Sequence, residues 1–139
     1  MTQRQVDKAA HILREFVVAM IRTTPQSDLS RTGAGTLSAL HREGPQRITA
    51  LADRESVSQP AMTGLIQRLE ASGLVVREAD PLDGRATLIA ITDAGRTTMQ
   101  ARRQEHDQSI AARVAQLDRE QLALLLAALP AITNLSEIS

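Results

Sequence analysis

The sequence predicts a mainly α-helical fold with one small β-hairpin. In most of the chain, apolar residues recur every three or four positions, which is the helical period. The period changes after Gly73, where two short β-rich runs, residues 74–76 and 87–92, follow each other closely and predict an antiparallel hairpin. Proline, glycine and capping residues mark the ends of the predicted helices.

The composition limits the classes of protein to which this chain can belong. Its 139 residues suit one domain, and its 16 basic and 16 acidic side chains give a net charge of zero, which argues against a simple polycation. It contains no cysteine, so a thiol redox switch, a disulfide framework and a thiolate metal site are excluded. No stretch approaches the ~20 apolar residues of a membrane span, and the N-terminus lacks a signal sequence. We therefore expect a cytoplasmic protein without membrane contact.

The N-terminal segment is predicted to be one long helix over about residues 3–24. Its apolar residues fall at steps of three and four and form a sustained stripe, of the kind that packs on another helix. Pro25 ends this helix, and we expect a turn or loop at residues 30–35.

Three short helices are predicted between residues 36 and 73. The first ends at Gly44, and the next starts near Thr49. The third begins at Ser58, whose side chain can cap free backbone N–H groups, and a proline suits its first turn because those groups have no partner within the helix. One side of this helix is apolar. The other side is small and polar and carries Gln59, Pro60, Thr63, Gly64 and Gln67, with Arg68 at its flank.

The third helix and the hairpin together suggest DNA binding. A helix with short amide and hydroxyl groups at its start fits the major groove of DNA. The hairpin loop at residues 80–85 is polar and presents Arg85 near its end. A helix-turn-helix followed by such a hairpin is a winged helix, which we expect at residues 36–92.

The C-terminal part is predicted to contain two helices. Thr92 caps a long polar helix that reaches about Gln116, and Asp118 caps the last helix with Gln121 as its capping-box partner. Residues 122–129 are apolar on every side, unlike a surface helix of a small monomer. We therefore expect a two-fold homodimer. The single domain of residues 1–139 would then contain dimerisation helices at residues 1–30 and 95–139.

Four stretches of the predicted winged helix carry recognisable motifs: SQPAMT at residues 58–63, RLEASGLV at 68–75, DPLDGR at 80–85 and LIAITDAG at 88–95. With these motifs the chain resembles the MarR family of bacterial transcriptional regulators. The resemblance covers about residues 36–100 in motif detail, and its most specific part is the loop motif followed by Thr-Asp-Ala-Gly.

The resemblance implies sequence-specific binding to double-stranded DNA through the third helix. From its chemistry, the amide of Gln59 or Gln67 can pair with adenine through two hydrogen bonds. Arg68 at the helix flank would contact a phosphate or pair with an acidic residue such as Glu70. The positions at which family members contact base edges and phosphates are occupied by Ser58, Gln59, Pro60 and Thr63.

The resemblance also assigns roles in the wing. Arg85 matches an arginine that enters the minor groove, whose negative potential suits a guanidinium. Asp83 matches the acid that braces the wing and that arginine. Without the resemblance, a solvated loop arginine is an equally good interpretation of Arg85. The chain departs from the family at Gly64, often arginine in relatives, and at Gln67, often acidic, so its operator sequence cannot be copied from relatives.

The charge of the predicted DNA-binding segment favours specific over non-specific binding. Between residues 36 and 91 there are six arginines and seven acidic residues, which gives a formal charge of −1. Binding to random DNA depends on neutralised phosphates and should therefore be weak. We expect a dimer that places two helices in successive major grooves, about 34–36 Å apart, on a near-palindromic operator. A repressor is the expected role.

Two other classes of function agree less well with the sequence. No G-x-S-x-G, P-loop or dinucleotide fingerprint occurs, so an enzyme is not expected, and neither is a cofactor. His11, His41 and His106 are too dispersed to indicate a metal site. The alternative function is a winged-helix module used only for protein contacts, which predicts no DNA affinity and no need for Arg85.

A small effector is implied by the resemblance alone. Many family members bind phenolic or anionic compounds between the dimerisation helices and the winged helix, and binding lowers their DNA affinity. Without cysteine, the peroxide-sensing branch does not apply to this chain. An aromatic or anionic effector would need an arginine or histidine beside an apolar wall. No motif specifies such a site, and the nearest candidates are His11, Arg14, Phe16, Met20 and His41.

Overall fold

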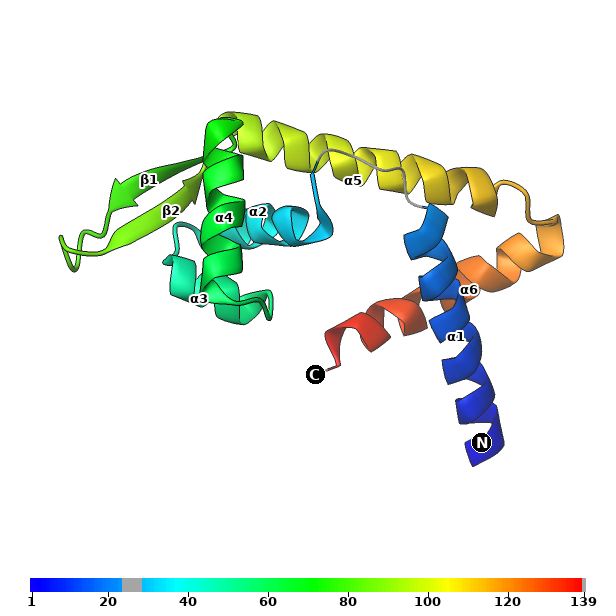
Figure 1. Ribbon diagram of the computed structural model, residues 1–139. Helices are drawn as coiled ribbons and strands as arrows, with labels where there is room; N and C mark the ends of the chain where they lie inside the picture. The colour runs from blue at the N-terminus through cyan, green and yellow to red at the C-terminus, as the bar shows by residue number, and fades with distance from the viewer. Residues whose placement is uncertain (24–28, 139) are drawn as a thin grey trace. The chain divides into compact units, whose positions relative to one another are not determined.

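The computed structural model describes residues 1–23 and 29–138. These residues form six helices and a two-stranded sheet, which confirms the predicted mainly α-helical class with one hairpin (Figure 1). The elements are α1 (Gln3–Thr23), α2 (Arg31–Glu43), α3 (Ile48–Arg54), α4 (Gln59–Ala71), β1 (Val75–Ala79), β2 (Thr87–Ile91), α5 (Asp93–Val114) and α6 (Arg119–Glu137).

The chain divides into two compact units. We call residues 26–104 the winged-helix unit, because it contains α2, α3, α4, the hairpin and the first half of α5. The second unit combines residues 1–25 with residues 105–139 and contains α1, the end of α5 and α6.

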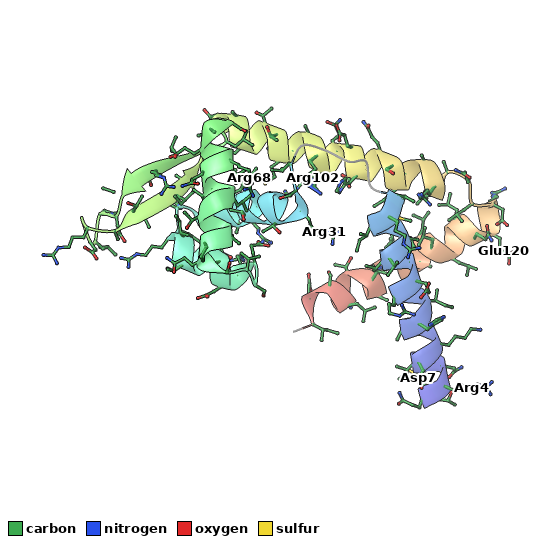
Figure 2. All side chains as sticks on the ribbon, in the orientation of Figure 1. Arg4, Asp7, Arg31, Arg68, Arg102 and Glu120 are labelled. Atoms are coloured by element: carbon green, nitrogen blue, oxygen red, sulfur yellow. The ribbon has the colours of Figure 1, made fainter. Side chains whose placement is uncertain are left out.

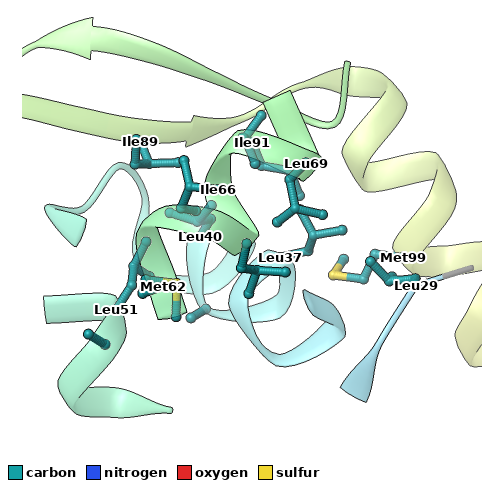
Figure 3. Close-up of a cluster of buried hydrophobic side chains, with 14 residues drawn as sticks. Leu29, Leu37, Leu40, Leu51, Met62, Ile66, Leu69, Ile89, Ile91 and Met99 are labelled. Carbon is teal, nitrogen blue, oxygen red and sulfur yellow. The ribbon is translucent and has the colours of Figure 1, made fainter. Parts of the chain in front are cut away.

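One hydrophobic core holds the winged-helix unit together (Figure 3). The predicted apolar side of α4 is confirmed as part of this core, since Met62 and Ile66 are completely buried. Leu37 from α2, Leu51 from α3 and Ile89 from β2 meet α4 there. Because α4 buries one side in this core, its polar side is left in solvent.

The hairpin is tied to the start of the helix-turn-helix. Strands β1 and β2 are antiparallel, with Val75 opposite Ile91 and Ala79 opposite Thr87. The N–H of Gln46 donates to the carbonyl of Ile89 at 3.0 Å, and the N–H of Ile89 donates back at 2.8 Å. Gln46 therefore extends the sheet by one bridge, immediately before α3 begins.

The start of α5 is fixed against the end of α4. The predicted Thr92 cap is confirmed, because its Oγ1 accepts from the N–H of Gly95 at 3.0 Å. The same hydroxyl donates to the carbonyl of Gly73 at 2.6 Å. A Cβ on Gly95 would clash with the carbonyl oxygen of Leu74, so only glycine allows this close approach.

The start of α2 differs from the sequence-based expectation. The predicted loop at residues 30–35 is wrong over residues 31–35, which are helical. Ser30 is the N-cap, and its Oγ accepts from the N–H of Gly33 at 3.0 Å. Glycine usually disfavours a helix, but here Gly33 is buried, and a Cβ on it would lie 2.9 Å from Leu29 Cδ1. Tight packing therefore overrides the local loop signal.

The second unit exposes most of its large apolar side chains. Neither α1 nor α6 has a buried residue. Phe16 and Val17 on α1 and Leu124 and Leu126 on α6 are all more than half exposed. The predicted capping box of α6 is confirmed, with Asp118 and Gln121 as reciprocal partners. None of the described helices is long and apolar enough to cross a membrane.

Candidate nucleic-acid interface

The start of α4 is a capped and exposed helix terminus. Ser58 Oγ accepts from the N–H of Ala61 at 3.2 Å, and Pro60 occupies the first turn, as the sequence predicts. The side chains of Ser58, Gln59 and Pro60 are exposed, and Thr63 one turn later is half-buried. These residues form one accessible surface that carries hydroxyl and amide groups without charge.

Arg68 lies in the last turn of α4 (Figure 2). Its Nη1 would be 3.6 Å from a Cβ placed on Gly64, so the guanidinium lies over the glycine one turn earlier. The predicted alternative of a pair with Glu70 is wrong, because Glu70 instead pairs with Arg77 Nε on β1 at 3.3 Å. Among the described residues, Arg68 has no ion-pair partner.

The wing loop is anchored to the N-terminus of α3 by a buried carboxylate. Asp80 is 8% exposed. Its Oδ2 accepts from Arg47 Nη2 at 2.8 Å and from Arg47 Nε at 3.3 Å. Its Oδ1 accepts from the N–H of Leu82 at 2.9 Å. These bonds fix the loop through side chains that are far apart in the sequence.

The environment of Asp80 favours its ionised form. The hydrogen bond from Arg47 lowers the pKa of the Asp80 carboxyl, and the backbone N–H of Leu82 lowers it further. The same hydrogen bond raises the pKa of Arg47. At the other end of α3, hydrogen bonding from Arg54 lowers the pKa of Glu43. Both carboxylates therefore act as charged structural braces.

Asp83 shapes the backbone next to Arg85. Its Oδ1 accepts from the N–H of Arg85 at 3.1 Å, and its Oδ2 lies 3.9 Å from Arg47 Nη2. Asp83 thus contacts the main chain of Arg85 and not its guanidinium. The Arg85 side chain is exposed. In the part of the chain that the structure describes, its guanidinium has no ion-pair partner.

The six arginines between residues 36 and 91 fall into two groups. Three of them pair with carboxylates inside the unit: Arg47 with Asp80, Arg54 with Glu43 and Arg77 with Glu70. The other three have no ion-pair partner within the described ranges: Arg42, Arg68 and Arg85. A guanidinium without an internal partner is available to an external anion such as a phosphate. Although the net charge of this segment is small, these three arginines are available to bind an external anion.

A pocket of about 600 Å³ lies beside α4 within the winged-helix unit. Its wall is mainly apolar, and Arg68 and Ser30 supply polar groups. None of the predicted effector-binding candidates lines it. Of these candidates, Arg14 pairs with Glu15 at 2.6 Å, and its Nη2 lies 3.5 Å from His11 Nδ1. The residues around the pocket are Leu29, Ser30, Leu65, Arg68, Leu69, Ala71, Ser72, Leu74 and Thr98.

Comparisons with known proteins identify the family. The family model of the MarR family matches residues 29–87. An HTH-type transcriptional regulator of Mycobacterium tuberculosis is 31% identical over 130 residues, which cover 88% of this chain and 91% of the relative. The chain belongs to the MarR family. It is therefore a transcriptional regulator of MarR type with a DNA-binding helix-turn-helix.

Solved structures agree with this MarR-family assignment. A transcriptional regulator of Pseudomonas aeruginosa is 28% identical with a TM-score of 0.79 and full coverage of both chains. A single-residue variant of MepR from Staphylococcus aureus, solved with a bound oligodeoxyribonucleotide, has a TM-score of 0.71. It is 22% identical and covers 91% of this chain and 96% of its own, so it supports the fold alone.

Sequence reasoning on this MarR-family chain misses the Arg47–Asp80 pair. The sequence places Asp80 only in a polar loop and assigns no role to Arg47. A local signal is present in Asp80-Pro81, since an aspartate before a turn often accepts from a backbone N–H two residues later. The partner cannot be found locally, because it is 33 positions from Asp80 in the sequence.

Proposed function

We propose that this MarR-family regulator is a repressor that binds a near-palindromic operator as a homodimer and releases it when a small anionic or aromatic ligand binds. In this proposal, residues 36–92 bind DNA, and residues 1–30 and 95–139 form the dimer. The observation that carries it is the capped, uncharged polar surface at the start of α4, in a unit that also holds three arginines without ion-pair partners among the described residues.

The major-groove contacts are assigned to the polar surface of α4. Short hydroxyl and amide groups at a helix start can approach base edges, and the capped terminus favours a nearby phosphate. Arg85 is assigned to the minor groove, and Asp83 acts indirectly by shaping its backbone. The MepR variant of this fold was solved with a bound oligodeoxyribonucleotide, and by analogy we assign DNA as the partner of this chain. The α4 residues in this proposal are Ser58, Gln59, Pro60, Thr63, Gln67 and Arg68.

The homodimer is supported by the apolar side chains of α1 and α6. Six large apolar residues on α1 are 38–55% exposed, and α6 has five that are 42–65% exposed. A stable single-chain protein rarely leaves so many apolar side chains in water on two helices. A second copy would bury them. Sedimentation at micromolar concentration tests this assignment, and a monomer would contradict it.

Ligand release is supported by the pocket beside α4. An apolar wall with one available guanidinium suits a small anion with an apolar body. Occupation of this pocket would change the surroundings of Arg68, which we also assign to DNA. Salicylate-like compounds should therefore be titrated against a preformed complex with DNA. Retention of the complex across a broad panel would count against ligand control.

The decisive experiment is an anisotropy titration with DNA that flanks the protein's own gene. Wild type is compared with Arg85→Ala and, as a matched control, Arg77→Ala, whose guanidinium already pairs with Glu70 on the neighbouring helix. The salt concentration is held at about 0.15 M, because such affinities depend steeply on it. We expect saturable binding to one near-palindromic site, which Arg85→Ala weakens and Arg77→Ala does not.

Two other outcomes separate the parts of this proposal. If wild type shows no sequence preference over several genomic fragments, the alternative of a protein-interaction module replaces it. If binding is specific but unaffected by Arg85→Ala, the regulator stands and the role of the wing is wrong. Repression itself is tested by placing the mapped operator over a promoter, where the protein should lower transcription.

A further inference from the structure

Leu82 at the tip of the wing is almost fully exposed. The residue is 95% accessible, whereas Val76, the other exposed large apolar residue in the described part of this unit, is 45% accessible. The loop that carries it joins β1 and β2 at the end of the hairpin that points away from α4 (Figure 1). The DNA-binding unit therefore presents one apolar side chain at its outer end.

The loop holds Leu82 in a fixed position. The N–H of Leu82 donates to Asp80 Oδ1 at 2.9 Å, and Asp80 is held by Arg47. Two backbone bonds close the loop: Asp80 N–H donates to the carbonyl of Ala86 at 3.0 Å, and Ala86 N–H donates to that of Asp83 at 2.9 Å. An ordered loop that presents an apolar side chain to a partner loses little conformational entropy on binding.

We propose that Leu82 is a DNA-contacting residue that packs into the minor groove beside Arg85 and favours A·T pairs there. This inference rests on the proposed binding of DNA by the wing. Apolar side chains, leucine among them, enter minor grooves in other DNA-binding proteins, where they wedge against the base steps. The contact needs no phosphate, so it adds affinity in a segment whose net charge gives little non-specific attraction.

The preference for A·T follows from the chemistry of the minor groove. A G·C pair places the guanine N2 amino group on the floor of the groove, whereas an A·T pair has no donor there. A leucine would leave that amino group without water or another acceptor, which is unfavourable. Leu82 therefore acts as a specificity residue that selects against G·C where the wing contacts DNA.

The test uses two variants of nearly constant size. Leu82→Met keeps an apolar side chain, and Leu82→Asn replaces it with a polar one of similar length. Because the side chain is exposed in the free protein, neither variant should alter thermal unfolding. On the footprinted site, we expect Leu82→Asn to bind about threefold to tenfold more weakly and Leu82→Met to bind within about twofold of wild type. The salt dependence of both should equal that of wild type, since neither substitution removes a cation that neutralises a phosphate.

A second measurement tests the preference for A·T. Hydroxyl-radical footprinting first locates the sugars that the wing protects. The A·T pairs there are then replaced by G·C or by inosine·C, which lacks the amino group in the minor groove. Wild type should discriminate against G·C but not against inosine·C, and Leu82→Asn should discriminate less between the two. Retained discrimination in Leu82→Asn would overturn the assigned preference.

The outcomes distinguish this inference from the proposed function. If wild type fails to bind any specific site, the proposed DNA binding is wrong, and so is the proposed contact of Leu82 with DNA. If wild type binds specifically and Leu82→Asn binds equally well, the regulator stands and the contact by Leu82 is wrong.

Discussion

Arg47 and Asp80 connect the N-terminus of α3 to the wing, although they are 33 positions apart in the sequence. The guanidinium donates twice to one carboxylate oxygen, and the other oxygen accepts from the N–H of Leu82. A residue at the start of α3 therefore holds the base of the loop that carries Leu82 and Arg85. This side-chain pair acts beside the backbone bridge between Gln46 and Ile89, which also ties the hairpin to α3.

The first prediction concerns Asp80→Asn. The amide oxygen can still accept from the N–H of Leu82, but the charged pair with Arg47 is removed. We expect the wing loop to become less ordered, and DNA affinity to fall by about threefold or more because the loop must then order on binding. Hydrogen exchange of the loop amides and anisotropy measure the two effects. Asp53→Asn is the control, since its side chain has no described ion-pair partner, and equal affinity of both variants would contradict the prediction.

The second prediction concerns pH. Arg47 lowers the pKa of Asp80 in the folded protein. The stability that this group contributes is therefore fully present above about pH 4, which is the ordinary pKa of an aspartate in the unfolded chain. It is lost as the pH falls through the lowered folded pKa. The difference in melting temperature between wild type and Asp80→Asn should therefore be constant at higher pH and narrow below about pH 4. A difference that persists unchanged in acid would contradict this account.

The third prediction compares two glycines. Gly95→Ala places a methyl group against the backbone carbonyl oxygen of Leu74, so it should destabilise the winged-helix unit by about 1–3 kcal/mol. Gly64→Ala meets only Arg68 Nη1 at 3.6 Å and should stabilise α4 by about 0.5–1 kcal/mol. Urea unfolding with linear extrapolation measures both. The two substitutions must change the free energy of unfolding in opposite directions. If Gly64→Ala destabilises the protein, the glycine is needed for the stability of the fold.

The elements with local signals are those that the sequence predicts well. Ser58 and Pro60 mark the start of α4, and Thr92 marks that of α5, because a cap and its N–H partner lie within three residues of each other. The start of α2 is not predicted from the sequence, because the reason for a glycine at position 33 of the helix is the close packing of Leu29 against it. That packing is tertiary, and the glycine alone indicates a loop.

In the candidate site too, some features follow from the sequence and others appear only in the folded structure. Arg85 and the polar side of α4 follow from spacing and resemblance to a family. The sequence could not show which arginines are available, since that depends on partners such as Asp80 for Arg47 and Glu70 for Arg77, which other elements supply. Only the folded unit shows that Arg68 lacks the predicted partner.

The fourth prediction sorts the arginines by the salt dependence of DNA binding. Alanine at Arg42, Arg68 or Arg85 removes a cation without a described ion-pair partner, so the slope of log affinity against log salt should fall by about one for each phosphate that is no longer neutralised. Alanine at Arg54 or Arg77 removes an internally paired cation and should leave the slope unchanged. The slope is measured for each variant on the footprinted site. Equal slopes for all five variants would show that internal pairing does not decide which arginines meet phosphate.

The last prediction separates the two roles of Ser58, which caps α4 and is assigned to DNA. Ser58→Ala removes the bond to the N–H of Ala61, so it should cost about 1 kcal/mol of stability and weaken DNA binding as well. Ser58→Asp keeps an oxygen at the cap, and its charge is favourable at a helix N-terminus, so the stability should be retained. The same charge would face the phosphates, and affinity should fall by about tenfold or more. Wild-type affinity in a stable Ser58→Asp variant would place DNA away from the start of α4.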